Sequence, residues 1–64
     1  MMKVKTKTAK ETRLVSEWLT RFGVDHTVKG FTLEFSDLEQ YEWNTLKSAV
    51  RLNTESNVDH LELN

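Results

Sequence analysis

The chain has 64 residues, no cysteine and a net charge of −1, so we expect one domain, residues 1–64, near the lower size limit for a self-supporting core. The lack of cysteine excludes disulfides, thiolate metal sites and thiol catalysis. No apolar run approaches the roughly 20 residues that cross a bilayer, and the lysine-rich N-terminus lacks the apolar stretch of a secretion signal, so we expect a cytoplasmic location.

Positive and negative residues are unevenly divided along the chain. Residues 1–32 carry a net charge of +4, and residues 33–64 carry one of −5. A fold that interleaves the two halves would bring these charges together. The division alone therefore identifies no binding partner.

The first third of the chain predicts a strand followed by a helix. From Met2 to Thr8, lysines alternate with apolar residues and threonines, which is the period of a half-buried strand. Thr8-Ala9-Lys10-Glu11 is a capping box, in which a hydroxyl and a carboxylate satisfy free backbone donors at a helix start. Gly23 is placed to end this helix in the left-handed conformation. The buried stripe of the helix is predicted to consist of Leu14, Val15, Trp18, Leu19 and Phe22.

Two antiparallel strands joined by a tight turn are predicted for Val24 to Phe35. Apolar residues alternate on both sides of Lys29-Gly30, and the glycine supplies the positive φ that a two-residue turn needs. The alternation assigns to the core face Val24, His26, Val28, Phe31, Leu33 and Phe35. The opposite face is polar and carries Asp25, Thr27, Lys29, Thr32 and Glu34.

A second capping box, Ser36-Asp37-Leu38-Glu39, predicts a second helix that starts at Asp37. Its broad apolar face is predicted to collect Leu38, Tyr41, Leu46, Ala49, Val50 and Leu52. Trp43 is predicted to lie at the margin of that face or beyond it. We expect the helix to end at Asn53 or in the polar run 54–57, because such residues favour caps and turns.

A last short strand is expected over Val58–Leu63, although its alternation is imperfect and calls for a bulge or a partner surface. The resulting order of elements resembles the ferredoxin-like fold. That resemblance implies an α+β, two-layer β-α-β-β-α-β sandwich with a four-stranded antiparallel sheet, in the strand order 4-1-3-2, and two helices on one face. The alternative is a β-α-β-β-α domain whose C-terminal tail pairs only with another chain.

The basic residues near the N-terminus make weak nucleic-acid binding the alternative function. They belong to the first strand and first helix and comprise Lys3, Lys5, Lys7, Lys10 and Arg13. An open sheet that binds single-stranded RNA also needs outward aromatic rings, on which stacking is worth about 1–3 kcal/mol per base. The outward positions of the third predicted strand are Thr32 and Glu34, so this platform is incomplete.

We expect no catalytic, metal or cofactor site. His26 and His60 fall on opposite edge strands of the predicted sheet, about 14 Å apart, so they cannot share a metal ion within one chain. The two glycines serve a helix end and a turn, which leaves no phosphate-binding glycine loop. A two-layer domain of this size also has little room for a catalytic cleft. We therefore expect a protein that is not an enzyme.

We therefore expect this protein to recognise another protein. The N-terminal half of the second helix would present an acidic surface with an aromatic anchor, made of Asp37, Glu39, Gln40, Glu42 and Trp43. The alternative for Trp43 is that it covers the end of the core. We expect a small regulatory protein, such as a phage-encoded or accessory inhibitor or an adaptor, that occupies a surface of a larger protein. A homodimer through the edge of the irregular last strand is a further expectation.

Overall fold

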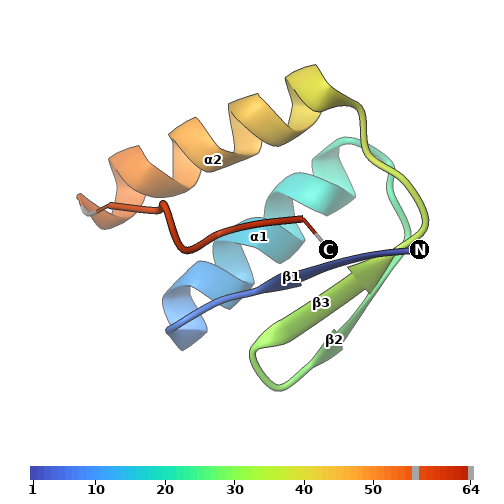
Figure 1. Ribbon diagram of the computed structural model, residues 1–64, viewed down its shortest axis with the longest axis horizontal. Coiled ribbons are helices and arrows are strands. Elements are labelled where there is room, and N and C mark those ends of the chain that lie inside the picture. Colours follow the sequence, from blue (N-terminus) through green and yellow to red (C-terminus); the bar gives the residue numbers. More distant parts are fainter. Residues whose placement is uncertain (56, 64) are drawn as a thin grey trace.

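The computed structural model describes residues 1–55 and 57–63 and shows an α+β domain of two helices and a three-stranded antiparallel sheet (Figure 1). Its elements are β1 (Met2–Lys5), α1 (Ala9–Arg21), β2 (His26–Lys29), β3 (Thr32–Phe35) and α2 (Gln40–Thr54). The sheet has the order β1-β3-β2, so that β3 is central. Both helices lie on one face of the sheet, and the other face is open (Figure 1).

Helix α1 begins and ends where the sequence predicts. The Thr8 hydroxyl accepts a hydrogen bond from the Glu11 N–H at 3.1 Å, which satisfies one of the free donors at the helix start. Phe22 caps the other end and is followed by Gly23, whose φ is +74°. The predicted stripe packs on the core through all of its members, Leu14, Val15, Trp18, Leu19 and Phe22.

Strand β1 is shorter than predicted, because it ends at Lys5 instead of Thr8. Residues 6–8, which the sequence assigned to the strand, lead from β1 into α1 instead. The Lys7 N–H donates to the Glu11 carboxylate at 2.9 Å, and Thr8 is the N-cap. Lys7 therefore lies outside the sheet.

The hairpin turn consists of Gly30 and Phe31, one position later than the predicted Lys29-Gly30. Lys29 pairs with Thr32 across it. Gly30, the first central residue of the turn, has a φ of +60°, and the second, Phe31, has a negative φ. This is the pattern of a type II′ turn. A residue with a side chain would be strained at Gly30 for this reason.

The core face of the hairpin is only partly covered. Leu33 and Phe35 are buried beneath the helices. Val28 opposes Leu33 and shares its face, yet Val28 and Phe31 are 46% and 54% exposed. The prediction that these two residues belong to the core is wrong, because a hollow between α1 and the turn leaves them uncovered.

Helix α2 begins at Gln40, later than the predicted start at Asp37. The Asp37 carboxylate accepts a hydrogen bond from the next N–H in the chain at 2.8 Å. Glu39 is the N-cap, and its backbone N–H donates a hydrogen bond to the Glu42 carboxylate at 3.0 Å. The capping box therefore lies about one turn later than predicted.

The C-terminal end of α2 agrees with the sequence. Its last residue, Thr54, lies in the region predicted to end the helix, and Glu55 follows in the left-handed conformation with a φ of 54°. Ser56, which belongs to the predicted terminating run, lies outside the described residues.

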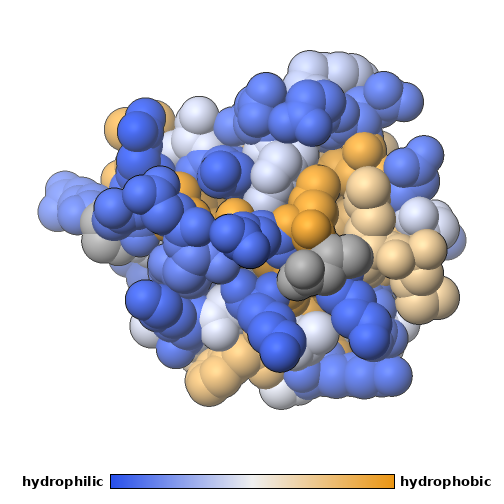
Figure 2. All heavy atoms as spheres, viewed as in Figure 1, coloured by the Kyte–Doolittle hydropathy of each residue, from blue (hydrophilic) through white to orange (hydrophobic). Residues whose placement is uncertain are grey.

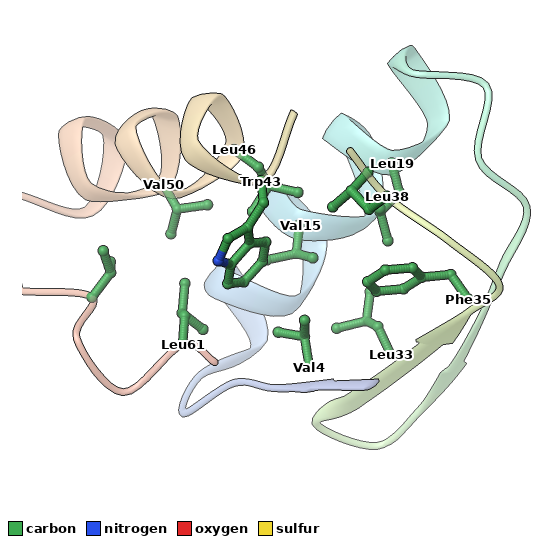
Figure 3. Packing of buried hydrophobic residues seen from close by; sticks show 11 residues of the cluster. Val4, Val15, Leu19, Leu33, Phe35, Leu38, Trp43, Leu46, Val50 and Leu61 are labelled. Carbon is green, nitrogen blue, oxygen red and sulfur yellow. The ribbon is translucent and has the colours of Figure 1, made fainter. Parts of the chain in front are cut away.

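Trp43 is part of the core and does not lie at the surface margin. Only 6% of it is exposed, and its ring points from α2 into the interior, toward Leu61 (Figure 3). At 100° per residue, Trp43 lies about 60° from Leu46 on the helix circumference, whereas Tyr41 lies about 140° from it. Tyr41 and Leu52, which the sequence assigned to the apolar face, are accordingly exposed.

The predicted fourth strand is absent from the described residues, where 57–63 follow an irregular path between α2 and β1 (Figure 1). Val58 and Leu61 are both buried, and the Leu61 N–H donates to the Val58 carbonyl at 2.9 Å. Residues three apart face opposite sides of a strand, so their common burial requires a turn of the backbone. The order β1-β3-β2 matches the ferredoxin-like sheet without its fourth strand, and the four-stranded arrangement is not confirmed. The elements follow the alternative order, β-α-β-β-α.

The core extends from the sheet to the C-terminal segment. Helix α1 packs on β2 and β3, and α2 packs on α1. The C-terminal segment fills the space between α2 and β1, where Leu61 lies near Val50 and Val4 (Figure 3). The buried apolar residues are Val4, Val15, Leu19, Leu33, Phe35, Leu38, Trp43, Leu46, Val50, Val58 and Leu61.

Candidate functional site

An exposed acidic surface surrounds the start of α2. Asp37, Glu39 and Gln40 are exposed, and Glu42 is half-buried with its carboxylate engaged in the helix cap. Tyr41 lies among them and is 68% exposed. These five residues, Asp37, Glu39, Gln40, Tyr41 and Glu42, are called the acidic surface below.

Tyr41, and not Trp43, is the aromatic side chain of the acidic surface. The structure brings together the four polar residues that the sequence predicts for partner binding, but Trp43 is turned into the core. Lys47 Nζ lies 5.9 Å from the centroid of the Trp43 ring and helps to cover it. Tyr41 was missed because it was assigned to the apolar face of the helix. Its angular distance from Leu46 is the signal that could have found it.

The basic residues predicted for nucleic-acid binding do not form one surface. Val4 is buried on the core face of β1, so Lys3 and Lys5 extend from the open face of the sheet. Lys10 lies on α1, across the sheet from them, and its Nζ donates to the Asn53 carbonyl at 3.2 Å. Lys7 precedes α1, and Arg13 lies on the side of α1 that faces the hairpin turn.

A carboxylate lies between two lysines on the open sheet face. Glu34 has one oxygen 3.3 Å from Lys29 Nζ and the other 3.6 Å from Lys3 Nζ. The hydrogen bond and the charge of Lys29, with a smaller effect of Lys3, lower the pKa of Glu34 below its ordinary value. This ionised carboxylate offsets part of the positive charge that a polyanion would need on this face.

A hollow of about 690 Å³ opens between α1 and the turn end of β2, and it is called the α1–β2 hollow below. Arg13, Ser16 and Glu17 of α1 line one side of it, and Val28 and Phe31 line the other. Figure 2 shows an apolar area at the lower edge of the molecule, over the hairpin turn, beneath a mostly hydrophilic surface. The exposed side chains of Val28 and Phe31 give the hollow an apolar wall.

Ser16 in the α1–β2 hollow is paired with a histidine. Its Oγ lies 2.6 Å from His26 Nε2, and His26 Nδ1 donates to the Val24 carbonyl at 3.1 Å. In the neutral tautomer that has its hydrogen on Nδ1, Nε2 accepts a hydrogen bond from the Ser16 hydroxyl, as the base beside a serine nucleophile does. Ser16 nevertheless lies in the middle of α1, where the neighbouring N–H groups are used by the helix and cannot form an oxyanion hole. The pair therefore serves to join α1 to β2.

A buried carboxylate joins three segments of the chain. Glu11 is 4% exposed, and its Oε1 accepts hydrogen bonds from the Lys7 N–H and from His60 Nε2, both at 2.9 Å. Burial by itself would raise the pKa of Glu11, but the hydrogen bonds from Lys7 and His60 and the charges of these residues lower it below 4.5. The sequence indicated only the capping role of Glu11, because His60 was assigned to a sheet margin.

We expect Glu11→Gln to lower the free energy of unfolding by about 1–3 kcal/mol at pH 7, because it weakens a buried, charge-assisted pair of hydrogen bonds. The carboxyl group has a lower pKa in the folded chain than in the unfolded chain. Its contribution to stability is therefore complete above pH 4.5 and is lost as the pH falls through the pKa of the folded state. Wild type and variant should converge in stability on acidification.

Urea unfolding at pH 7 and at several more acidic values measures this convergence. Glu17→Gln, at an exposed position of the same helix, is the matched control and should change stability by less than about 0.5 kcal/mol. The lowered pKa of Glu34 affects all three proteins alike. A constant difference between wild type and Glu11→Gln across this pH range would contradict the assignment.

No protein-family model, curated protein or solved structure matches the chain. Within residues 1–55 and 57–63, no three His, Asp or Glu side chains are grouped to hold a metal ion. In the same part of the chain, no helix is both long and apolar enough to cross a membrane.

Proposed function

We propose that this chain is a small, non-enzymatic protein that binds a larger protein through the acidic surface and acts by occupying that partner's surface. The observation that carries the proposal is Tyr41, which is 68% exposed beside Asp37, Glu39 and Gln40. A tyrosine buries a large area with few rotatable bonds and keeps a polar tip, which suits an interface anchor. The surrounding carboxylates favour a basic surface on the partner.

The acidic surface is flanked by residues that anchor the start of α2 to the core. Leu38 precedes Tyr41 and Trp43 follows it, and both are buried in the core. Glu42 fixes the first turn of α2 through its hydrogen bond to the Glu39 N–H. A surface that is already ordered loses little conformational freedom on binding, which favours affinity.

We propose a regulatory role of the inhibitor or adaptor kind, since occupying a partner's surface requires no catalytic group. We also propose that the domain is a ferredoxin-like fold in which the irregular segment 57–63 stands in place of the last strand. The order β1-β3-β2 and the two helices on one face of the sheet support this relationship.

Capture of partners from a lysate on the immobilised chain, with and without nuclease, tests the proposed function. We expect a protein partner that survives nuclease treatment. Tyr41→Ala should weaken its binding at least tenfold, a loss of about 1.4 kcal/mol, without changing the stability of the domain. Leu52→Ala, an exposed apolar residue at the other end of α2, is the control and should bind as wild type does.

Binding that is unchanged by Tyr41→Ala would contradict the role of the acidic surface. Loss of all captured material after nuclease treatment would favour the alternative, a weak nucleic-acid binder. The alternative has less support, because Lys3 and Lys5 lie across the sheet from Lys10 and Arg13. Nucleic-acid binding would also weaken steeply as the salt concentration rises.

A further inference from the structure

Strand β2 is an edge strand with main-chain groups directed away from the sheet. The residues that flank a two-residue turn form a hydrogen-bonded pair, and such pairs alternate with non-bonded pairs along an antiparallel ladder. Lys29 and Thr27 therefore bond to β3, whereas His26 and Val28 direct their N–H and C=O groups outward. The other edge, β1, has the C-terminal segment beside it (Figure 1).

We propose that two copies of this chain pair through β2, antiparallel and about a twofold axis at Thr27, to form one six-stranded sheet. In this register, His26 of each copy lies opposite Val28 of the other. The outward N–H and C=O groups of both residues then form hydrogen-bonded pairs across the axis. A twofold axis perpendicular to the sheet keeps the helices of both copies on the same face.

The charges of Lys29 on β2 and of Asp25, the residue just before the strand, favour a second copy as the occupant of this edge. With Thr27 on the axis, Asp25 of each copy lies opposite Lys29 of the other, and the two Thr27 side chains face each other. Opposite charges and threonine pairs both stabilise neighbouring strands. Asp25 forms no ion pair with another described residue. Shifting the register by two residues keeps the main-chain hydrogen bonds in phase but removes both charge pairs.

The half-exposed apolar residues also favour this interface. Val28 is directed to the helix face and borders the α1–β2 hollow. In the proposed dimer it packs beside His26 of the second copy and loses contact with water. Pairing also covers the main-chain groups that an unpaired edge exposes to non-specific association.

A cysteine placed on the proposed axis tests the register. The chain has no cysteine, so Thr27→Cys introduces its only thiol. Cα atoms in a non-hydrogen-bonded pair lie about 4.5 Å apart, which is within the range for a disulfide. We expect mild oxidation to join Thr27→Cys into a covalent dimer at least tenfold faster than Thr45→Cys, an exposed position on α2. Equal rates for the two variants would overturn the proposal.

Charge reversal tests the same contact without a covalent bond. We expect sedimentation velocity to show a concentration-dependent dimer for the wild-type chain. Asp25→Lys and Lys29→Glu should each raise its dissociation constant about tenfold, because each places two pairs of like charges across the axis. An equimolar mixture of the two variants restores opposite charges at both positions and should dimerise again.

The folded state of each variant is verified by circular dichroism, because Lys29→Glu also removes the ion pair with Glu34, a surface contact of small energy. A wild-type chain that stays monomeric at all concentrations would overturn the proposal. The proposal would also be overturned by a dimer whose dissociation constant is unchanged by both substitutions, or by an equimolar mixture of the two variants that does not dimerise. Tyr41→Ala leaves β2 unchanged, so this proposal and the proposed function can fail separately.

Discussion

Trp43→Ala is expected to lower the free energy of unfolding by about 3–5 kcal/mol, which is more than Trp18→Ala should cost. Trp43 is buried between α2 and the C-terminal segment, whereas Trp18 is half-buried on α1. Removing the indole of Trp43 leaves a cavity that the surrounding side chains can close only in part. A domain of this size is stable by only about 3–10 kcal/mol in total, so much of the variant should be unfolded at 25 °C.

Urea unfolding followed by far-ultraviolet circular dichroism measures both variants, because this signal reports mainly the backbone of the helices and strands. Trp18→Ala is the matched control, since it removes the same side chain from a less buried position. If it costs as much as Trp43→Ala or more, Trp43 lies at the margin of the helix face, where the sequence alone placed it.

Leu61→Ala is expected to cost about 2–4 kcal/mol, although Leu61 lies in no helix or strand. Its side chain is buried beside Val50 and Val4, so its removal opens a cavity between α2 and β1. Thermal and urea unfolding should both report the loss. Leu52→Ala removes the same side chain from an exposed position and should change stability by less than about 0.5 kcal/mol. Equal effects of the two substitutions would show that residues 57–63 are not part of the core.

Short-range signals in the sequence were sufficient for α1 and for the central strand. Thr8 and Glu11 are three residues apart, and their contact depends only on the helix that they start. The alternation of Leu33 and Phe35 likewise gives the buried face of β3. These features could be predicted because each depends on a few neighbouring residues.

The start of α2 could not be decided from the capping residues alone. Ser36-Asp37-Leu38-Glu39 matches the capping-box pattern, but the structure forms its capping box between Glu39 and Glu42. In that register, Leu38 and Trp43 occupy the positions before the cap and four residues into the helix, where two apolar side chains form a hydrophobic staple. Both are buried. Weighing the staple with the cap would have placed Trp43 in the core.

The placement of residues 57–63 and the hydrogen bond between Glu11 and His60 depend on contacts between distant parts of the chain. Glu11 and His60 are 49 residues apart, and no local pattern links them. Val58 and Leu61 are buried because α2 and β1 leave a space that the segment fills. The polar members of the acidic surface could be predicted from composition, whereas the exposure of Tyr41 required the correct helix face.

From the position of residues 57–63 between α2 and β1, we expect this segment to open before the rest of the domain unfolds. Helix α2 is held to the rest of the molecule by α1 on one side and by this segment on the other. Release of the segment would expose the side of α2 that it covers. The β1-β3-β2 sheet and the packing of α1 on it would remain. Such an opening is a sub-global unfolding step with a smaller free energy than complete unfolding. Glu11 would lose its hydrogen bond to His60 in that step and keep the one from the Lys7 N–H. The pKa of Glu11 should therefore change in the partly open form as well as in the unfolded one.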